Sequence, residues 1–169
     1  MASKVRWTLA AMGVLMLVGG SGSIFWTPAD EILYAAAGPR GACGSHGCLG
    51  LYTLELGNTG GEVQPDVRVR LRQAVLDSAV LPPKARDYGK FDRPVGVTRD
   101  GQTVTYALGE IGPEVRVELS FVLRRDTREA LPGWDDVLVA VEPARGRALP
   151  GSAPFVILLR IWYSIARVF

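Results

Sequence analysis

The sequence predicts an all-β antiparallel sandwich, with a transmembrane helix before it and an amphipathic, membrane-associated segment after it. Apolar and polar residues alternate in short runs between Leu49 and Val141, and glycine- and proline-containing turns separate these runs. The expected organisation is a cytoplasmic N-terminus (1–6), a transmembrane helix (7–26), a glycine-rich linker (27–48), an extracytoplasmic sandwich (49–145) and a linker with a C-terminal amphipathic helix (146–169).

The N-terminal helix is predicted from a stretch without charge that runs from Trp7 to Trp26. Twenty helical residues span roughly 30 Å, which matches the hydrocarbon thickness of a bilayer. The two tryptophans mark the interfaces, and Lys4 and Arg6 keep the N-terminus in the cytoplasm. We therefore expect a single-pass protein of the bacterial inner membrane whose main domain is periplasmic.

A cleavable secretory signal is the alternative reading of the same stretch. The strongest apolar run, Leu9 to Val18, has the length of a signal-peptide core, and Ser21-Gly22-Ser23 offers small residues for cleavage. Both readings place the domain outside the cytoplasm.

The charge balance argues against a nucleic-acid partner. The formal net charge is +2, but four of the 19 basic residues (Lys4, Arg6, Arg160 and Arg167) lie in the two terminal segments. The remaining basic residues are outnumbered by the 17 acidic ones, whereas phosphate binding requires a basic face.

Both cysteines, Cys43 and Cys48, lie in the glycine-rich stretch 35–50 with the single histidine, His46. In an oxidising compartment two nearby cysteines of a small exported domain pair with each other, so we expect a disulfide. A copper or zinc site on Cys43, His46 and Cys48 is the alternative, but a closed zinc site would lack a fourth Cys or His ligand. We expect no cofactor.

The first two strands follow this stretch. Leu49 to Leu56 predicts one strand, residues 57–61 predict a turn, and the next run alternates valine or leucine with arginine. The arginines Arg68, Arg70 and Arg72 should line one face of that strand. This row is either a solvated face or a docking surface for an acidic partner or lipid headgroups.

The remaining strands are predicted by alternation on either side of turns. Pro82 and Pro83 interrupt the regular pattern, and residues 84–92 are expected to form a surface loop. A hairpin follows, with Asp100-Gly101 at its turn. Two further strands then cover residues 115–123 and 137–141. No convincing helix is predicted between Leu49 and Pro143.

Two stretches carry a resemblance to a known family: LYTLELGNTGGEVQPDVRVRL, and later LGEIGPEVRVELSFVL. They resemble the immunoglobulin-like modules of bacterial exported proteins, in which an Asn-x-Gly turn and a Gly-Pro turn precede regular strands. The resemblance implies an immunoglobulin-like sandwich that binds proteins or acts as a spacer.

The C-terminal segment, residues 155–169, is apolar except for Arg160, Ser164 and Arg167, which fall on one stripe of a helix. An interfacial helix with Trp162 and Tyr163 near the headgroups fits this pattern. A second transmembrane span would be short and would bury Arg160. The competing reading is a last strand, PFVILLRIWY, that closes the sandwich.

The chain is not expected to be an enzyme, since no catalytic constellation, phosphate loop or dinucleotide motif is present. We expect a non-catalytic accessory or assembly subunit whose partners are the bilayer and other subunits of a larger membrane complex. Energy-transducing complexes, respiratory or photosynthetic, often contain such subunits. The rival functions are a copper or redox carrier on Cys43, His46 and Cys48, and a free-standing binding domain.

Overall fold

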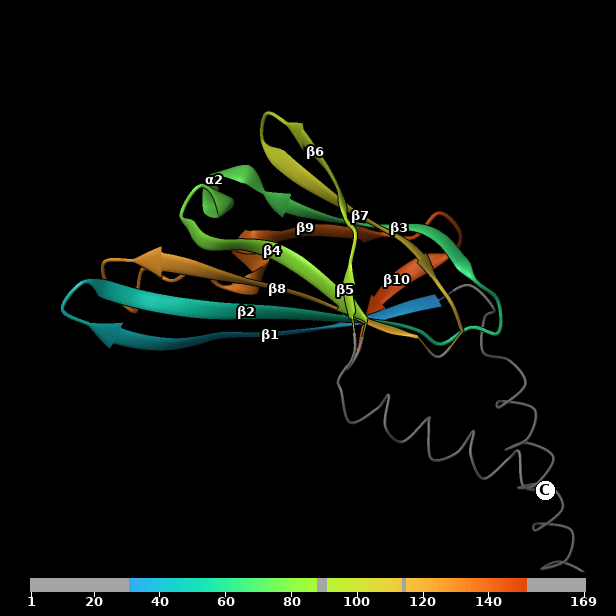
Figure 1. The fold of residues 1–169 in the computed structure, drawn as a ribbon, viewed down its shortest axis with the longest axis horizontal. Coiled ribbons are helices and arrows are strands. Elements are labelled where there is room, and N and C mark those ends of the chain that lie inside the picture. The colour runs from blue at the N-terminus through green and yellow to red at the C-terminus, as the bar shows by residue number, and fades with distance from the viewer. Residues whose placement is uncertain (1–30, 88–90, 114, 152–169) are drawn as a thin grey trace, which may run out of the picture.

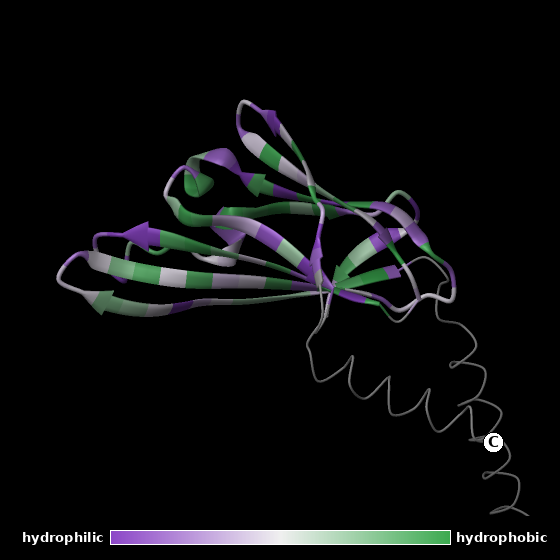
Figure 2. Cartoon of the chain, viewed as in Figure 1, coloured by the Kyte–Doolittle hydropathy of each residue, from purple (hydrophilic) through white to green (hydrophobic). Residues whose placement is uncertain are grey.

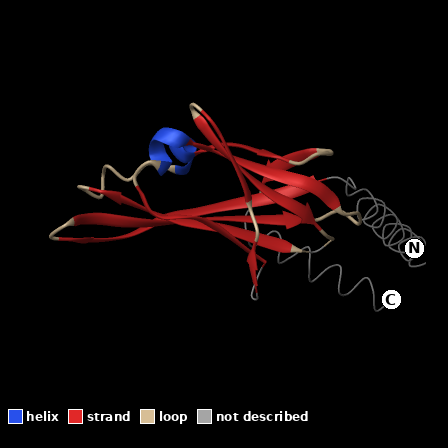
Figure 3. Ribbon diagram, turned by 45° about the horizontal axis from the view of Figure 1, so that its top comes forward, coloured by secondary structure: helices blue, strands red, loops and turns tan. Residues whose placement is uncertain are grey.

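The computed structural model describes residues 31–87, 91–113 and 115–151, which form two β-sheets packed face to face (Figure 3). The expected sandwich is confirmed. One sheet has the strand order β10-β1-β2-β8-β4-β5 and the other β6-β7-β3-β9 (Figure 1). The elements are β1 (Glu31–Gly44), β2 (Gly47–Asn58), β3 (Gln64–Arg72), α2 (Gln73–Leu76), β4 (Ala79–Asp87), β5 (Phe91–Arg93), β6 (Gly96–Asp100), β7 (Thr103–Ile111), β8 (Arg116–Arg125), α3 (Trp134–Val137), β9 (Leu138–Glu142) and β10 (Arg147–Pro150).

Neighbouring strands are antiparallel, except that β1 and β10 pair in parallel. Period-two alternation explains the core, because each strand turns every second residue toward the opposite sheet. In β8, for example, Val117, Leu119, Phe121 and Leu123 are buried and their neighbours are not. Figure 2 shows how apolar and polar residues are distributed along the strands of both sheets.

The expectation of an irregular linker over residues 27–48 is wrong where the structure describes it. Residues 31–44 form β1, which pairs with β2 up to Gly44 and Gly47. The glycines serve close packing there: a Cβ on Gly38 would lie 2.5 Å from the Leu51 carbonyl oxygen, and one on Gly41 would lie 2.9 Å from that of Leu49. A strand rich in glycine and alanine has no alternation for sequence analysis to detect.

The expected surface loop over residues 84–92 is also wrong in part. Residues 79–87 form β4, which pairs with β8, and a short β5 returns beside it. Pro82 and Pro83 fall at a register shift between Leu81 and Lys84, where the ladder is interrupted. Proline is tolerated in a sheet at such an irregularity because no ladder hydrogen bond is lost.

Two short helices, α2 and α3, were also not expected, and each is a single turn of four residues. The hairpin at Asp100-Gly101 is confirmed by the pairing of β6 with β7, in which Asp100 lies opposite Thr103. The strands expected over 115–123 and 137–141 correspond to β8 and β9.

No helix among the residues that the structure describes is long and apolar enough to cross a bilayer. The segment expected to do so, 7–26, lies outside those residues. The expected membrane-anchoring side chains also lie outside them: Trp7, Trp26, Arg160, Trp162, Tyr163 and Arg167.

Candidate functional site

The hairpin that joins β1 to β2 carries the predicted disulfide. Cys43 and Cys48 lie directly opposite each other in the ladder and their sulfurs are bonded, which confirms the pairing. Gly47 has φ +101°, a conformation that side chains disfavour, and a Cβ there would lie 2.5 Å from the Arg125 carbonyl oxygen. The Arg124 guanidinium, at the C-terminal end of β8, donates to the carbonyl of His46 at 2.6 Å. This hydrogen bond fixes the β1–β2 turn against β8.

The disulfide removes the alternative metal site in this form of the protein, because bonded sulfurs are not thiolate ligands. His46 is left as a single exposed imidazole at the turn. Elsewhere in the described part of the chain no group of three or more His, Cys, Asp or Glu residues is placed to hold a metal ion.

The arginine row lies on the exposed face of β3, but acidic neighbours offset its charge. Arg68 forms an ion pair with Asp66, and this hydrogen bond raises the pKa of the guanidinium. Arg70 pairs with Glu142 of the adjacent strand at 3.1 Å, and Arg72 is exposed. These exposed pairs contribute little to stability. Two of the three arginines are therefore unavailable as an uncompensated basic surface.

An apolar patch on the outer face of the larger sheet was missed by sequence analysis. Leu51 of β2 lies opposite Val122 of β8, which in turn lies opposite Leu81 of β4. Leu49 and Leu51 are 45% and 42% exposed and Leu81 is 56% exposed. The one signal in the sequence was that leucines occur at both odd and even positions of residues 49–54, so that a strand would place leucine on both of its faces. We call this set the outer patch: Leu49, Leu51, Leu81 and Val122.

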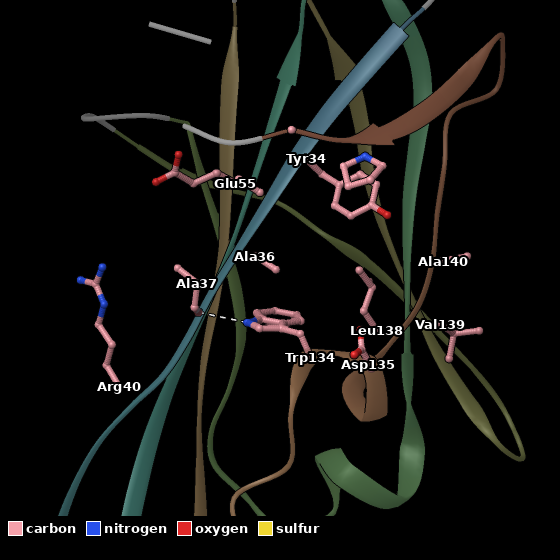
Figure 4. Close-up of a pocket in the computed structure, with 13 residues that line it drawn as sticks. Tyr34, Ala36, Ala37, Arg40, Glu55, Trp134, Asp135, Leu138, Val139 and Ala140 are labelled. Carbon is pink, nitrogen blue, oxygen red and sulfur yellow. Dashed lines mark hydrogen bonds between the residues drawn. The ribbon is translucent and has the colours of Figure 1, made fainter. Parts of the chain in front are cut away.

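A groove of about 870 Å³ opens between β1 of one sheet and β9 of the other (Figure 4). Its walls are mainly apolar and include Ala36 of β1 and Val139 of β9. The indole of Trp134, from α3, crosses toward β1, where its Nε1 donates to the carbonyl of Ala37 at 3.1 Å. Pro150 and Gly151, the last described residues, lie at the other end of the lining.

Trp134, which lines this groove, also belongs to a cluster of three aromatic rings. Tyr52 and Phe121 stack with their centroids 5.2 Å apart, and the Trp134 ring meets both edge-on at 5.7 and 5.8 Å. The Tyr52 hydroxyl donates to the carbonyl of Pro132 at 2.7 Å. These ring contacts stabilise the fold beyond the effect of burying the rings, and they link α3 to the opposite sheet.

Folding stability is expected to fall as the pH rises above about 10. Burial raises the pKa of Tyr52 and of Tyr106 above the ordinary value of 10.0, although Arg125 and Arg99 oppose the effect. At high pH the unfolded chain therefore loses these protons first, and the free energy of unfolding decreases. Urea unfolding between about pH 8 and pH 11 would measure the decline. Tyr106→Phe should make it shallower, and an unchanged slope in that variant would contradict the assignment.

The structure thus defines an all-β sandwich with one disulfide, an exposed outer patch and a groove between two edge strands. No family model and no curated protein sequence matches the chain.

Solved structures with partial similarity include a GH20 exo-β-N-acetylglucosaminidase from Vibrio harveyi, as an inactive mutant and in complex with N-acetylglucosamine. Each is 9% identical, with TM-scores of 0.40 and 0.41, and the matched region covers 72% of this chain and 18% of the glycosidase. The chitin-binding domain of Chi18aC from Streptomyces coelicolor is 16% identical with a TM-score of 0.33, covering 68% of this chain and 93% of that domain. Similarity at this level bears on neither the activity nor the ligand.

Proposed function

We propose that this protein is a non-catalytic accessory subunit that docks its sandwich on a larger membrane protein complex outside the cytoplasm. The observation that carries the proposal is the outer patch, which leaves three leucines exposed on the outer face of the larger sheet. An exposed apolar patch of this kind marks a contact surface, because hiding it from water is favourable.

The position of the outer patch favours a protein partner over the bilayer. Leu51 lies opposite Arg40, nine residues along β1 from Glu31, where the described chain begins. At about 3.3 Å per residue this is roughly 30 Å. In Figure 1 the β1–β2 hairpin extends away from the end of the sandwich where β1 and β10 both begin. A domain tethered to the membrane before Glu31 would hold the patch beyond the headgroups.

Two features support an extracytoplasmic location. The Cys43–Cys48 disulfide forms and persists in oxidising compartments and is rare in the cytosol. The uncharged stretch 7–26 has the length of a membrane span and follows two basic residues, which favours export of everything after it.

We further propose that the sandwich is a variant of the immunoglobulin fold. The neighbours β1-β2-β8-β4 follow the order A-B-E-D of that fold, and β3 pairs with β9 as strand C pairs with F. The hairpin β6–β7 would then be an addition beside strand C. Such sandwiches commonly serve as binding modules, which agrees with a docking role.

The docking test compares the intact chain with two variants in native membranes solubilised in mild detergent. Leu51→Glu places a charge in the outer patch and should lower the fraction of the protein that migrates with a larger complex by at least about tenfold. Thr53→Glu is the matched control, because Thr53 is two residues along β2 on the same face, opposite Ser120. Migration of the wild-type protein as a free monomer, or equal loss in both variants, would refute the proposal.

A further inference from the structure

One edge of β1 has no strand partner beyond Tyr34 among the residues that the structure describes. β2 pairs with β1 from Ile32 to Gly44, whereas β10 pairs on the other side only from Glu31 to Tyr34. In Figure 1, β1 is the outermost strand of the projecting β1–β2 hairpin. An unpaired edge of this kind offers backbone donors and acceptors to a strand of another molecule.

The geometry of the hairpin shows which backbone groups point to this edge. The Cα atoms of Cys43 and Cys48 are 4.0 Å apart, as expected for an antiparallel pair that exchanges no backbone hydrogen bonds. The N–H and carbonyl of Cys43 therefore point away from β2. Because bonding alternates along a ladder, those of Gly41 also point away, whereas those of Ala42 point toward β2.

The other end of the same ladder agrees with this assignment. The extra residue at the bulge between Ala37 and Arg40 lies on β1, so the alternation along β2 continues from Cys48 to Leu56. The partner of Leu56 is Tyr34, whose carbonyl should then point away from β2. It does, because it accepts from the N–H of Gly151 at 2.8 Å.

Positive charge without a paired carboxylate surrounds the edge over residues 40–44. Arg40 begins this segment, and Arg124 and Arg125 end β8, on the far side of β2. None of the three arginines forms an ion pair with a described residue. Arg124 donates instead to the carbonyl of His46. A strand added at this edge would therefore be favoured by acidic side chains.

We propose that residues 40–44 of β1 bind an extended segment of the partner subunit as an added strand, and that this segment carries apolar and acidic side chains. The inference rests on the proposed docking function and gives the partner's contact a structural form. The edge is continuous with the outer patch, because Arg40 and Ala42 lie opposite Leu51 and Leu49. The added strand would lie roughly 10 Å from β2, so its side chains would border the patch.

A second copy of this chain fits the edge poorly. Pairing two β1 edges about a two-fold axis would bring Arg40, Arg124 and Arg125 of both copies to one interface, where like charges repel. A partner segment with carboxylates removes that repulsion.

The test is residue-resolved hydrogen exchange of the full chain, measured by mass spectrometry in the larger complex and after release by a stronger detergent. The amides of Gly41 and Cys43 should exchange at least about tenfold more slowly in the complex, because only there do they donate to a strand. The amide of Ala42 is the internal control. It bonds β2 in both states and should not change.

Two charge reversals test the predicted acidic character of the partner. Arg40→Glu should lower the fraction of the protein that migrates with the larger complex by at least about tenfold. Arg72→Glu is the matched control, because Arg72 is also exposed at the end of a strand, has no ion pair with a described residue and lies in the other sheet. Equal loss in both variants would overturn the proposal.

The exchange data separate strand addition from docking itself. Rapid exchange of Gly41 and Cys43 in the complex, together with loss of migration in Leu51→Glu, would leave docking intact and overturn strand addition. Slow exchange of both amides in the released protein would show that the chain covers its own edge, which also overturns it. Migration of the wild-type protein as a free monomer would refute docking, and this inference with it.

Discussion

Phe121→Ala is expected to lower the free energy of unfolding by about 4 kcal/mol, the value typical of a large aromatic side chain removed from a core. Phe121 is 1% exposed and stacks on Tyr52, and its ring also meets the edge of Trp134. The cavity would form where both sheets and α3 meet, so neighbouring side chains cannot collapse into it without moving a strand. Urea unfolding followed by circular dichroism would measure the loss.

The control is the next residue, Val122, which lies on the same strand but on the outer face. Val122→Ala should cost less than about 1 kcal/mol, because it removes little buried surface. Equal losses in the two variants would show that the ring cluster does not hold the sheets together.

Asn58→Ala is expected to cost about 3 kcal/mol, because its side chain satisfies three backbone groups in a buried turn. Its Nδ2 donates to the carbonyls of Glu62 at 2.7 Å and Ile111 at 2.9 Å, and its Oδ1 accepts from the N–H of Gly60 at 2.9 Å. Asn58 is only 2% exposed, so water cannot replace these bonds. The residue fixes the turn after β2 and ties it to the end of β7.

Thr59→Ala is the matched control for this turn. Its hydroxyl donates to the carbonyl of Glu31 at 3.4 Å, a long bond whose removal should cost less than about 1 kcal/mol. A loss at Asn58 no larger than that at Thr59 would refute the view that the amide organises the turn. Thermal unfolding of both variants at one protein concentration would decide it.

Strands with clear alternation were predictable to within a few residues. The strand expected over 115–123 is β8, Arg116–Arg125, because every second side chain is apolar, and the β6–β7 hairpin turns at Asp100-Gly101, which suits a tight reversal. β1 was not predictable, because its sequence lacks alternation and the carbonyls of β2 that closely approach Gly38 and Gly41 belong to another segment. Local composition there favours a loop, and only the ladder with β2 makes it a strand.

The candidate surfaces depended still more on the tertiary structure. Arg68 and Arg70 were found as a row, but their acidic partners Asp66 and Glu142 became visible only in space. The outer patch joins residues of β2, β4 and β8, whose register no sequence pattern gives. The groove likewise needs both sheets, since one wall comes from β1 and the other from β9.

Alternation and the spacing of two cysteines are local properties, and from them a β-sandwich with a Cys43–Cys48 disulfide was predicted. Which apolar residues remain exposed, and which strand edges border the groove, became visible in the fold. Burial and strand pairing are set by contacts between segments far apart in the chain, and no local pattern encodes them.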